Sequence, residues 1–365
     1  MKARAAVLIE PRRFEMREFD VPDPGDNAAV LRVEACGLCG TDADQYHGKT
    51  AEIGLPLPVI PGHEIVGYIH TISESASKRW GVKTGDRVAV EASVPCGSCE
   101  LCLRGNYLRC TAHIGYGTYI TVDQAPYLWG GYAEYLYLHP NTVLHKVSHA
   151  LSAEEAVLFN PLSNAIRWAA QLPGTQIGDT VVIFGPGQRG ILCAVAAHAA
   201  GATKIIVGGL SRDQDRLALV REMVGAEIVD VENEDIVQRV QVLTDGHMAD
   251  IAVDVSANAT QPVVDSLDVV KVGGKVVLAG LKSYQSIPHF ISDKIVQKEV
   301  QILGAWSAGL ESVRPAIRML EAKRYPFELL LTHRFPLEQA DLAVRTLARE
   351  VEGEEPFHVT ILPNG

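Results

Sequence analysis

The sequence lacks an apolar run long enough to cross a bilayer, and its beginning, MKARAAVLIEPRRFEMREFD, has no apolar core of the kind found in a secretion signal. It also lacks an excess of positive charge. Its 33 Lys and Arg against 44 Asp and Glu give a net charge of −11, which argues against nucleic-acid binding. No internal repeat and no low-complexity tract is present. We therefore expect a cytoplasmic protein that binds neither membranes nor nucleic acid.

Cysteine is scarce, yet four of the seven cysteines fall within residues 94–110, VPCGSCELCLRGNYLRC. Disulfides are rare in the cytoplasm. The spacing Cys96-x2-Cys99-x2-Cys102-x7-Cys110 suits four thiolates that close a tetrahedron around Zn²⁺. Four protein ligands leave no open position, so such a zinc would be structural. Four free buried thiols and an iron–sulfur cluster are the alternatives that the pattern leaves open.

The sequence pattern changes near the middle of the chain. Residues 1 to about 160 hold short β-rich runs such as AAVLRVEA and GDRVAVEA, separated by Pro and Gly, which predicts a mostly-β region. From about residue 178, six apolar runs (TVVIFG, TKIIVGG, EIVDV, DIAVDVS, GKVVLAG and VQILGAW) alternate mainly with helical stretches. This alternation predicts a doubly wound parallel sheet, in which one helix should begin at Ser211 and end before Gly225. A chain of 365 residues is long enough for about two such domains.

A glycine-rich turn follows the first of these strands. The segment VVIFGPGQRG contains Gly185-x-Gly187-x-x-Gly190 directly after a strand and at the start of a helix. The first glycine allows the turn, the second lets the backbone approach a pyrophosphate, and the third packs helix on strand. The free N–H groups of the helix would then face the phosphates, which predicts a dinucleotide site; an ordinary glycine turn is the alternative.

The end of the second strand bears on the choice of dinucleotide. NAD-binding domains usually place an acid there to hold the ribose 2′-hydroxyl. Here the segment IIVGGLSRD has Gly209 in that place, followed by Ser211 and Arg212. A missing acid beside a cation favours a 2′-phosphate and hence NADP(H) over NAD(H). The alternative is that Arg212 is a solvated residue at a helix start.

Two short motifs in the β-rich half carry reactive side chains. CGLCGTD offers the thiolate of Cys39, the hydroxyl of Thr41 and the carboxylate of Asp42, and GHE offers the imidazole of His63. A metal bound by Cys and His with one open position is a catalytic zinc arrangement. Asp42 could orient one of these ligands without binding the metal itself. Taken singly, each residue is more often structural, and a lone His63 would more often be a core histidine.

Together with GDRV at 85–88, these motifs resemble in order and spacing the zinc-containing medium-chain dehydrogenases, which include alcohol, polyol and threonine dehydrogenases. The resemblance covers essentially the whole chain. It implies an α/β protein with a GroES-like, mostly-β catalytic domain formed by residues 1–163 and 304–365, with a structural-zinc lobe at about 94–112. It also implies a Rossmann dinucleotide-binding domain at 164–303, inserted between the two parts of the catalytic domain.

The same resemblance implies roles for single residues. Cys39 and His63 would bind the catalytic zinc, Glu64 would be the adjacent acid that approaches the metal, and Thr41 would be the first hydroxyl of a proton relay. The four lobe cysteines would bind the structural zinc. The reaction would be hydride transfer between the nicotinamide and a small alcohol or carbonyl compound. We also expect a homodimer or homotetramer.

Three positions depart from the family pattern. Asn160, in LFNPLSNA, stands where a third zinc ligand is usually Cys, Asp or Glu, so either Asn160 or Glu64 could complete the site. Asp44 stands where many members carry a relay histidine, and Arg189 occupies a usually small position of the glycine-rich turn. Two rival functions therefore stay open. One is a zinc-independent reductase of the same superfamily, and the other is a zinc-stabilised nucleotide-binding protein without turnover.

Overall fold

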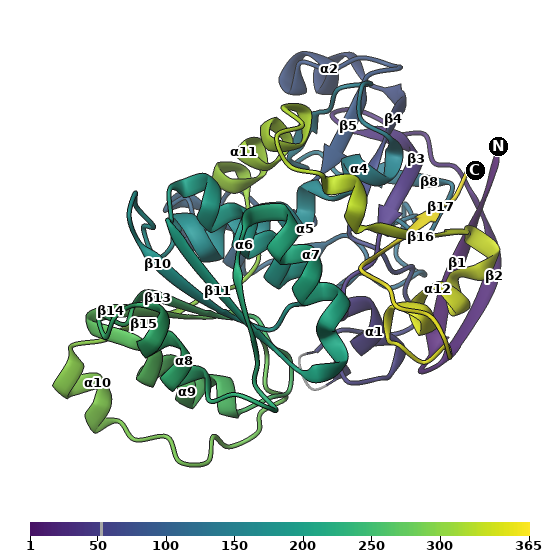
Figure 1. The fold of residues 1–365 in the computed structure, drawn as a ribbon. Helices are drawn as coiled ribbons and strands as arrows, with labels where there is room; N and C mark the ends of the chain where they lie inside the picture. Colours follow the sequence, from purple (N-terminus) through teal and green to yellow (C-terminus); the bar gives the residue numbers. More distant parts are fainter. Residues whose placement is uncertain (52–53) are drawn as a thin grey trace. The chain divides into compact units, whose positions relative to one another are not determined.

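The computed structural model describes residues 1–51 and 54–365, which form two compact units (Figure 1). The first unit consists of Met1–Asn160 and Ile317–Gly365, so both ends of the chain contribute to it. The second unit consists of Pro161–Ala316. Within the described ranges, no helix combines the length and the apolar character needed to cross a bilayer.

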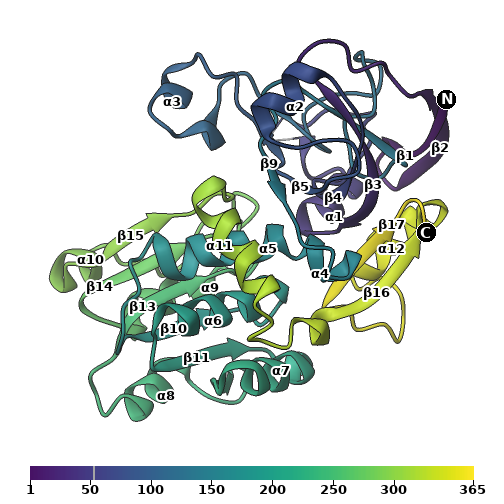
Figure 2. The ribbon, with the colours of Figure 1, turned by 90° about the horizontal axis from the view of Figure 1, so that it is seen from above.

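A seven-stranded sheet is the centre of the first unit. Its strand order is β16-β17-β3-β4-β5-β9, and β8 also pairs with β3. The C-terminal strand β17 runs antiparallel to β3 and pairs Thr360 with Gly37 and Ile361 with Cys36, while β16 and β17 lie side by side in Figure 2. The two ends of the chain therefore share one sheet. Its strands and those of two separate two-stranded sheets, β1-β2 and β6-β7, are β1 (Lys2–Glu10), β2 (Arg13–Asp20), β3 (Ala29–Gly37), β4 (Glu64–Ile72), β5 (Arg87–Val90), β6 (Ser93–Val94), β7 (Ile114–Gly115), β8 (Tyr135–Leu138), β9 (Leu144–Lys146), β16 (Leu331–Pro336) and β17 (His358–Leu362).

Short helices connect these strands. Several begin at polar caps, such as Ser73 before α2 and Ser152 before α4, whose hydroxyls accept backbone N–H groups of the first turn. They are α1 (Gly40–Tyr46), α2 (Glu74–Trp80), α3 (Glu100–Leu103), α4 (Ala153–Val157) and α12 (Ala340–Leu347), with single turns at Tyr107–Arg109, Phe327–Leu330 and Leu337–Gln339.

The arginine of the GDRV motif holds the sheet to the segment before α4. The Arg87 side chain is 1% exposed, and its Nε donates to Glu34 Oε2 at 2.6 Å. Its Nη1 donates to the carbonyls of Ser148 and Leu151, each at 2.8 Å, and its Nη2 donates to the carbonyl of Ser152 at 3.1 Å. A buried guanidinium needs such partners, so this motif is structural.

The second unit contains the predicted doubly wound sheet. All six predicted strands are present in the order β12-β11-β10-β13-β14-β15, and every neighbouring pair is parallel. The strand order reverses between β10 and β13, and this topological switch point is where such sheets bind ligands, outside the carboxyl ends of the strands. The strands are β10 (Thr180–Phe184), β11 (Lys204–Gly209), β12 (Glu227–Asp230), β13 (Ala249–Asp254), β14 (Val270–Leu278) and β15 (Gln301–Gly304).

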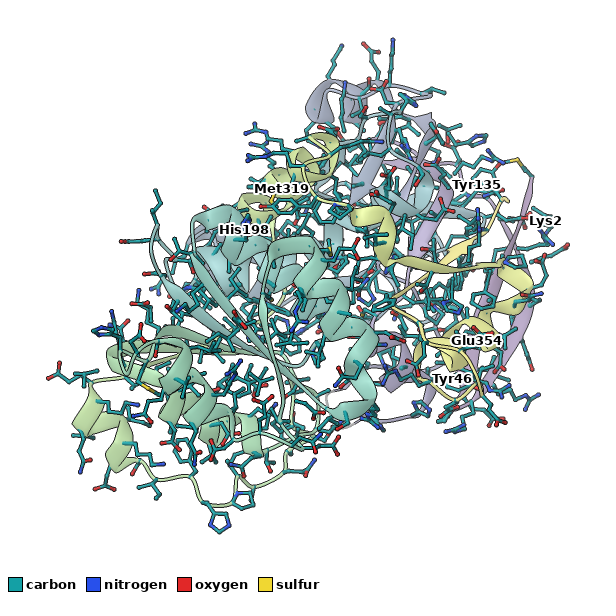
Figure 3. All side chains as sticks on the ribbon, viewed as in Figure 1. Lys2, Tyr46, Tyr135, His198, Met319 and Glu354 are labelled. Carbon is teal, nitrogen blue, oxygen red and sulfur yellow. The ribbon has the colours of Figure 1, made fainter. Side chains whose placement is uncertain are left out.

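Helices cover both faces of this sheet. Ile236 and Leu267, from the neighbouring helices α8 and α9, share a core cluster with Val182 and Ile206 of the sheet. The alternate residues Val181 and Ile183 are equally buried, and they point to the opposite face, where α6 and α7 lie side by side (Figure 1). His198, labelled in Figure 3, lies in the last turn of α6. The helices are α5 (Phe159–Ile166) with a π-turn at Arg167–Gln171, α6 (Gln188–Ala200), α7 (Gln214–Val224), α8 (Ile236–Leu243), α9 (Gln261–Val269), α10 (Asp293–Lys298) and α11 (Leu310–Glu321).

The division between the units differs from the expected boundaries at residues 163 and 303. It falls inside α5, after Asn160, and inside α11, after Ala316. Residues just beyond β15 belong to the second unit because they bond to it: Ala305 N–H donates to the carbonyl of Leu278, and Ser312 Oγ donates to Gln171 Oε1 at 2.6 Å.

Candidate active site and nucleotide site

Cys39 and His63 come together because β3 and β4 form an antiparallel pair. Gly37, at the end of β3, pairs with Glu64, at the start of β4, so the residues just outside this pair meet at the same edge. Cys39 Sγ lies 3.1 Å from His63 Nε2. Both side chains are largely buried. A thiolate and an imidazole nitrogen this close can bind one zinc ion.

Asp42 lies on the other side of the imidazole. Its Oδ2 accepts the backbone N–H of Cys39 at 2.8 Å, and its Oδ1 lies 4.0 Å from His63 Nδ1. The ligand atoms of Cys39, Asp42 and His63 all lie within 4.8 Å of one another. His63 therefore has Nε2 toward the thiol and Nδ1 toward a carboxylate 4.0 Å away, which is farther than a hydrogen bond but on the side from which a carboxylate orients a metal-binding histidine. The N–H of Thr41 also donates to Cys39 Sγ, at 3.3 Å, and this favours the thiolate.

Glu64 is fully buried, but it does not belong to the cluster of Cys39, Asp42 and His63. A Cβ at Gly37 would lie 2.6 Å from Glu64 Oε2 and 3.0 Å from His358 Cε1, so the glycine leaves room for both side chains. Burial lowers the pKa of His358 to about 3, which keeps this imidazole neutral. Asn160 is half-buried in the first turn of α5. Glu64 and Asn160 are therefore both candidates for the third ligand of the catalytic zinc.

The two predicted relay residues share one helix. Thr41 and Asp44 are half-buried and three residues apart in α1, and this spacing places them on one face of the helix. Burial raises the pKa of the Asp44 carboxyl, and the charges of Lys49 and His47 oppose that shift. The helix can therefore carry a hydroxyl and a carboxyl side by side next to the thiolate of Cys39.

The four lobe cysteines surround one point. Their sulfur atoms all lie within 4.8 Å of one another. Cys96 Sγ is 3.9 Å from Cys102 Sγ, and Cys99 Sγ is 4.0 Å from Cys110 Sγ. A tetrahedral site with Zn–S bonds of 2.3 Å requires sulfur atoms about 3.8 Å apart. The spacing is much longer than a disulfide bond and fits a structural zinc.

Backbone N–H groups stabilise the thiolate form of Cys96. Cys96 Sγ accepts from Ser98 N at 3.4 Å and from Cys99 N at 3.3 Å, and these donors lower the pKa of Cys96 to about 5. The lobe, which carries α3, extends from the sheet in Figure 2. It is tied back by Tyr107, whose hydroxyl donates to Glu91 Oε2 at 2.6 Å, while Glu91 Oε1 is 2.7 Å from His145 Nε2.

The glycine-rich turn of the second unit has the expected geometry. Gly185 has a φ of +98°, which favours glycine. A Cβ at Gly190 would lie 1.8 Å from the carbonyl oxygen of Gly185, so helix and strand approach closely there. A Cβ at Gly187, directly before α6, would meet only Arg216 Nη1, at 3.6 Å. The space beside Gly187 is open to a phosphate, and Arg216 is a nearby cation that sequence reasoning missed because it belongs to the next helix, α7.

A steric contact explains why position 209 is a glycine. A Cβ there would lie 2.6 Å from Pro186 Cγ and 3.0 Å from Pro186 Cδ. The missing acid is therefore dictated partly by the proline of the turn and is a weaker sign of NADP(H) than the sequence suggested. Ser211 donates its hydroxyl to Asp230 Oδ2 at 2.7 Å, whereas Arg212 is exposed and forms no ion pair with any described residue.

Arg189 of the turn packs its guanidinium 5.3 Å from the centre of the Trp168 ring. This cation–π contact accounts for a long cationic side chain at this position of the turn. It belongs to the second unit and needs no role in cofactor binding.

Comparisons with known proteins agree with this arrangement. The family model described as the alcohol dehydrogenase GroES-like domain matches residues 25–149, and the one described as zinc-binding dehydrogenase matches residues 190–322. An alcohol dehydrogenase of Mycobacterium tuberculosis is 44% identical over 366 residues, which covers 99% of this chain and 98% of that protein. An alcohol dehydrogenase structure from Thermotoga maritima matches this chain with a TM-score of 0.89 and 24% sequence identity. A zinc-binding dehydrogenase structure from Sinorhizobium meliloti, bound to NADP, matches it with a TM-score of 0.86 and 24% sequence identity. In both comparisons the match covers 100% of this chain and 100% of the other.

The first unit thus has the predicted GroES-like fold, the second unit has the predicted Rossmann fold, and the two cysteine-containing clusters match the donors that zinc prefers. Identity of 44% across nearly the whole chain leaves no alternative family. The chain belongs to the zinc-containing medium-chain dehydrogenases, the family of the zinc-dependent alcohol dehydrogenases.

Proposed function

We propose that this alcohol dehydrogenase transfers hydride between NADP(H) and a small alcohol or carbonyl substrate, with a catalytic zinc held by Cys39 and His63. The observation that carries the proposal is the 3.1 Å approach of Cys39 Sγ to His63 Nε2, with Asp42 behind the imidazole. Bound there, zinc would supply Lewis-acid chemistry by polarising the substrate oxygen and lowering the pKa of the alcohol. Four further cysteines form a separate site, which explains why one chain would need two zinc ions.

The proton is handled by the chain itself. Thr41 lies two residues after Cys39, so its hydroxyl can accept the alcohol proton and donate its own onward. Asp44, on the same face of α1, is the next group able to receive that proton, and its raised pKa suits it for the purpose. Either Asn160 or Glu64 completes the zinc site.

The preference for NADP(H) is supported by two features and opposed by one. No acid stands at position 209, and the exposed Arg212 is available to a 2′-phosphate. However, the hydroxyl of Ser211 already donates to Asp230, whose negative charge would repel a phosphate. We give more weight to Arg212 because its guanidinium can form a direct, charge-assisted hydrogen bond with a phosphate.

A panel of primary, secondary and polyhydric alcohols, assayed with NADP⁺ and with NAD⁺, tests the proposal. We expect zinc-dependent turnover and a higher kcat/KM with NADP⁺. Arg212→Ala should lower kcat/KM for NADP⁺ by about 10- to 100-fold, since a charged hydrogen bond contributes about 1.5–3 kcal/mol, and should leave NAD⁺ unaffected. A higher kcat/KM of the wild type with NAD⁺ would contradict the cofactor preference, and absence of turnover with every alcohol would contradict the activity.

The proposed homodimer or homotetramer is supported by the sheet of the second unit. Strand β15 pairs only with β14 among the described residues, so its outer edge is open, and Ile302 on this strand is exposed. Open apolar edges invite pairing with another chain. Light scattering coupled to gel filtration measures the assembly, and a monomer at all concentrations would contradict the proposal.

A further inference from the structure

A buried charged cluster lies at the carboxyl end of the parallel sheet, outside the glycine-rich turn. Lys282, in the loop after β14, places its Nζ 2.8 Å from Asp254 Oδ2 at the end of β13. The Lys282 side chain is 11% exposed and that of Asp254 is 0% exposed. The catalytic scheme uses neither residue, although burying two charges is costly and needs a reason.

The ammonium group of Lys282 is fully occupied by protein atoms. Besides the carboxylate, its Nζ donates to the carbonyl oxygen of Ser256 at 2.5 Å and to Ser256 Oγ at 3.0 Å. A lysine has three N–H groups, and these three contacts use all of them. Lys282 therefore has no donor left for a ligand, and any effect on a ligand must pass through the residues that it holds.

The residue held in place is Ser256. Its N–H and its hydroxyl both donate to Asp254 Oδ1, at 3.0 and 2.6 Å, while its carbonyl and hydroxyl oxygens accept from Lys282. Ser256 is thus fixed through its backbone N–H, its carbonyl and its side chain at once.

Ser256 in turn lies directly against the glycine-rich turn. A Cβ at Gly185 would approach Ser256 Cα to 3.2 Å and Ser256 N to 3.3 Å, and a Cβ at Gly280 would lie 2.1 Å from the Ser256 carbonyl oxygen. The serine is therefore wedged between the turn after β10 and the loop after β14. Ser256 itself follows β13, so the serine and the turn after β10 meet at the switch point between β10 and β13, where a doubly wound sheet binds its dinucleotide.

We propose that Lys282 is a positioning residue for the dinucleotide: through Asp254 and Ser256 it fixes the wall of the nucleotide crevice against Gly185. The proposal rests on the dinucleotide-binding function proposed above. It predicts that loss of the ammonium group weakens cofactor binding without removing any group that touches the cofactor.

The test measures NADPH affinity of the zinc-loaded full chain by fluorescence titration, without alcohol. Lys282→Met keeps the length of the side chain and removes the charge. We expect the Kd for NADPH to rise about tenfold, because the loss of one charge-assisted contact costs about 1.4 kcal/mol, which corresponds to a factor of ten in Kd. Lys294→Met is the matched control, because Lys294 forms an ion pair with Asp268 at 2.6 Å in the same unit, on α10. The control should leave Kd within twofold of the wild type.

A second variant separates positioning from stability. Lys282→Met leaves Asp254 buried without its counter-charge, so the urea midpoint should fall; adding Asp254→Asn removes that charge and should restore most of the midpoint. Kd should stay raised in the double variant, since Ser256 still lacks the ammonium donor. Should Lys282→Met not fold, the double variant and Ser256→Ala, which removes only the shared hydroxyl, carry the test, and Kd should rise in both.

The outcomes are distinguishable. If the wild type binds NADPH and Lys282→Met or the double variant binds it equally well, the positioning role is wrong while the proposed function stands. If the wild type binds neither NADPH nor NADH, the proposed function fails and the positioning role with it.

Discussion

The contact between position 209 and Pro186 predicts that an acid cannot be introduced at position 209 by a single substitution without a loss of stability. An obvious route toward NAD⁺ is Gly209→Asp, which restores the acid at the end of β11. A Cβ there would lie 2.6 Å from Pro186 Cγ, about 0.9 Å inside the ordinary carbon–carbon contact of about 3.5 Å. The third neighbour, Leu217 Cδ2 at 3.3 Å, is the end of a flexible side chain and can move by the few tenths of an ångström required.

The proline cannot move aside in the same way. Its ring is closed on its own backbone, between Gly185, whose N–H donates to the Gly208 carbonyl, and Gly187 at the start of α6. We therefore expect Gly209→Asp alone to destabilise the protein by about 1–3 kcal/mol, the usual cost of overpacking. Pro186→Ala removes both clashing carbons, so the same substitution should cost about 1–2 kcal/mol less in that background, a coupling typical of residues in contact.

The assay is a double-mutant cycle on the wild type, Pro186→Ala, Gly209→Asp and the double variant. Urea unfolding of the cofactor-free, zinc-loaded proteins gives the four stabilities, and binding of NADPH and NADH gives the preferences. Only the double variant should combine near-normal stability with a shift toward NADH. Equal costs of Gly209→Asp in both backgrounds would refute the steric explanation of Gly209.

Three further predictions concern the two metal clusters and one buried histidine. Cys99→Ser should remove one zinc per chain and lower the stability of the protein more than it changes the catalytic rate, which metal analysis and thermal unfolding measure. Retention of both zinc ions would argue against a zinc site in the lobe. Because the Asn160 amide is neutral and a weak zinc ligand, mild chelation should remove the catalytic zinc before the lobe zinc, and Asn160→Glu should delay that loss; simultaneous release of both zincs would contradict this. Burial lowers the pKa of His358 to about 3, below its value of about 6.5 in the unfolded chain. The unfolded chain therefore binds a proton more readily than the folded protein between these two pH values. The stability that depends on neutral His358 is complete above about pH 6.5 and is lost as the pH falls toward 3. The free energy of unfolding of His358→Asn should therefore depend less on pH in that window than that of the wild type, and parallel pH profiles would show that the histidine contributes nothing.

Features set by short stretches of sequence were predictable. The six strands of the second unit follow from continuous apolar runs, and Gly225 ends α7 with a φ of +68° because such a cap favours glycine. The prediction that Ser211 begins this helix was inexact: Ser211–Asp213 forms a 3₁₀ turn and α7 begins at Gln214, since the serine hydroxyl donates to Asp230 and does not cap the helix. The lobe cysteines were recognisable because their spacing alone suits a tetrahedral site.

Features that depend on which loops meet at a sheet edge were not predictable. Pro186 follows β10 and Gly209 ends β11, and their contact exists only because these strands are neighbours with Phe184 opposite Gly208. The same holds for Lys282 and Asp254, which look like ordinary surface charges in the sequence. The third catalytic ligand stayed open for a related reason, since Asn160 and Glu64 are both chemically able to approach a metal.

The pairing of β17 with β3 has a consequence for the order in which the protein can fold during synthesis. β17 covers the Cys36–Gly37 end of β3, the end that leads directly into Cys39, yet it is built from His358–Leu362 at the very end of the chain. The second unit is contiguous, so it can fold as soon as Ala316 has left the ribosome, while the first unit waits with this edge of β3 unpaired. The part of the chain that is made first, including Cys39, is therefore the last to be completed, and it is exposed to misassembly for longest.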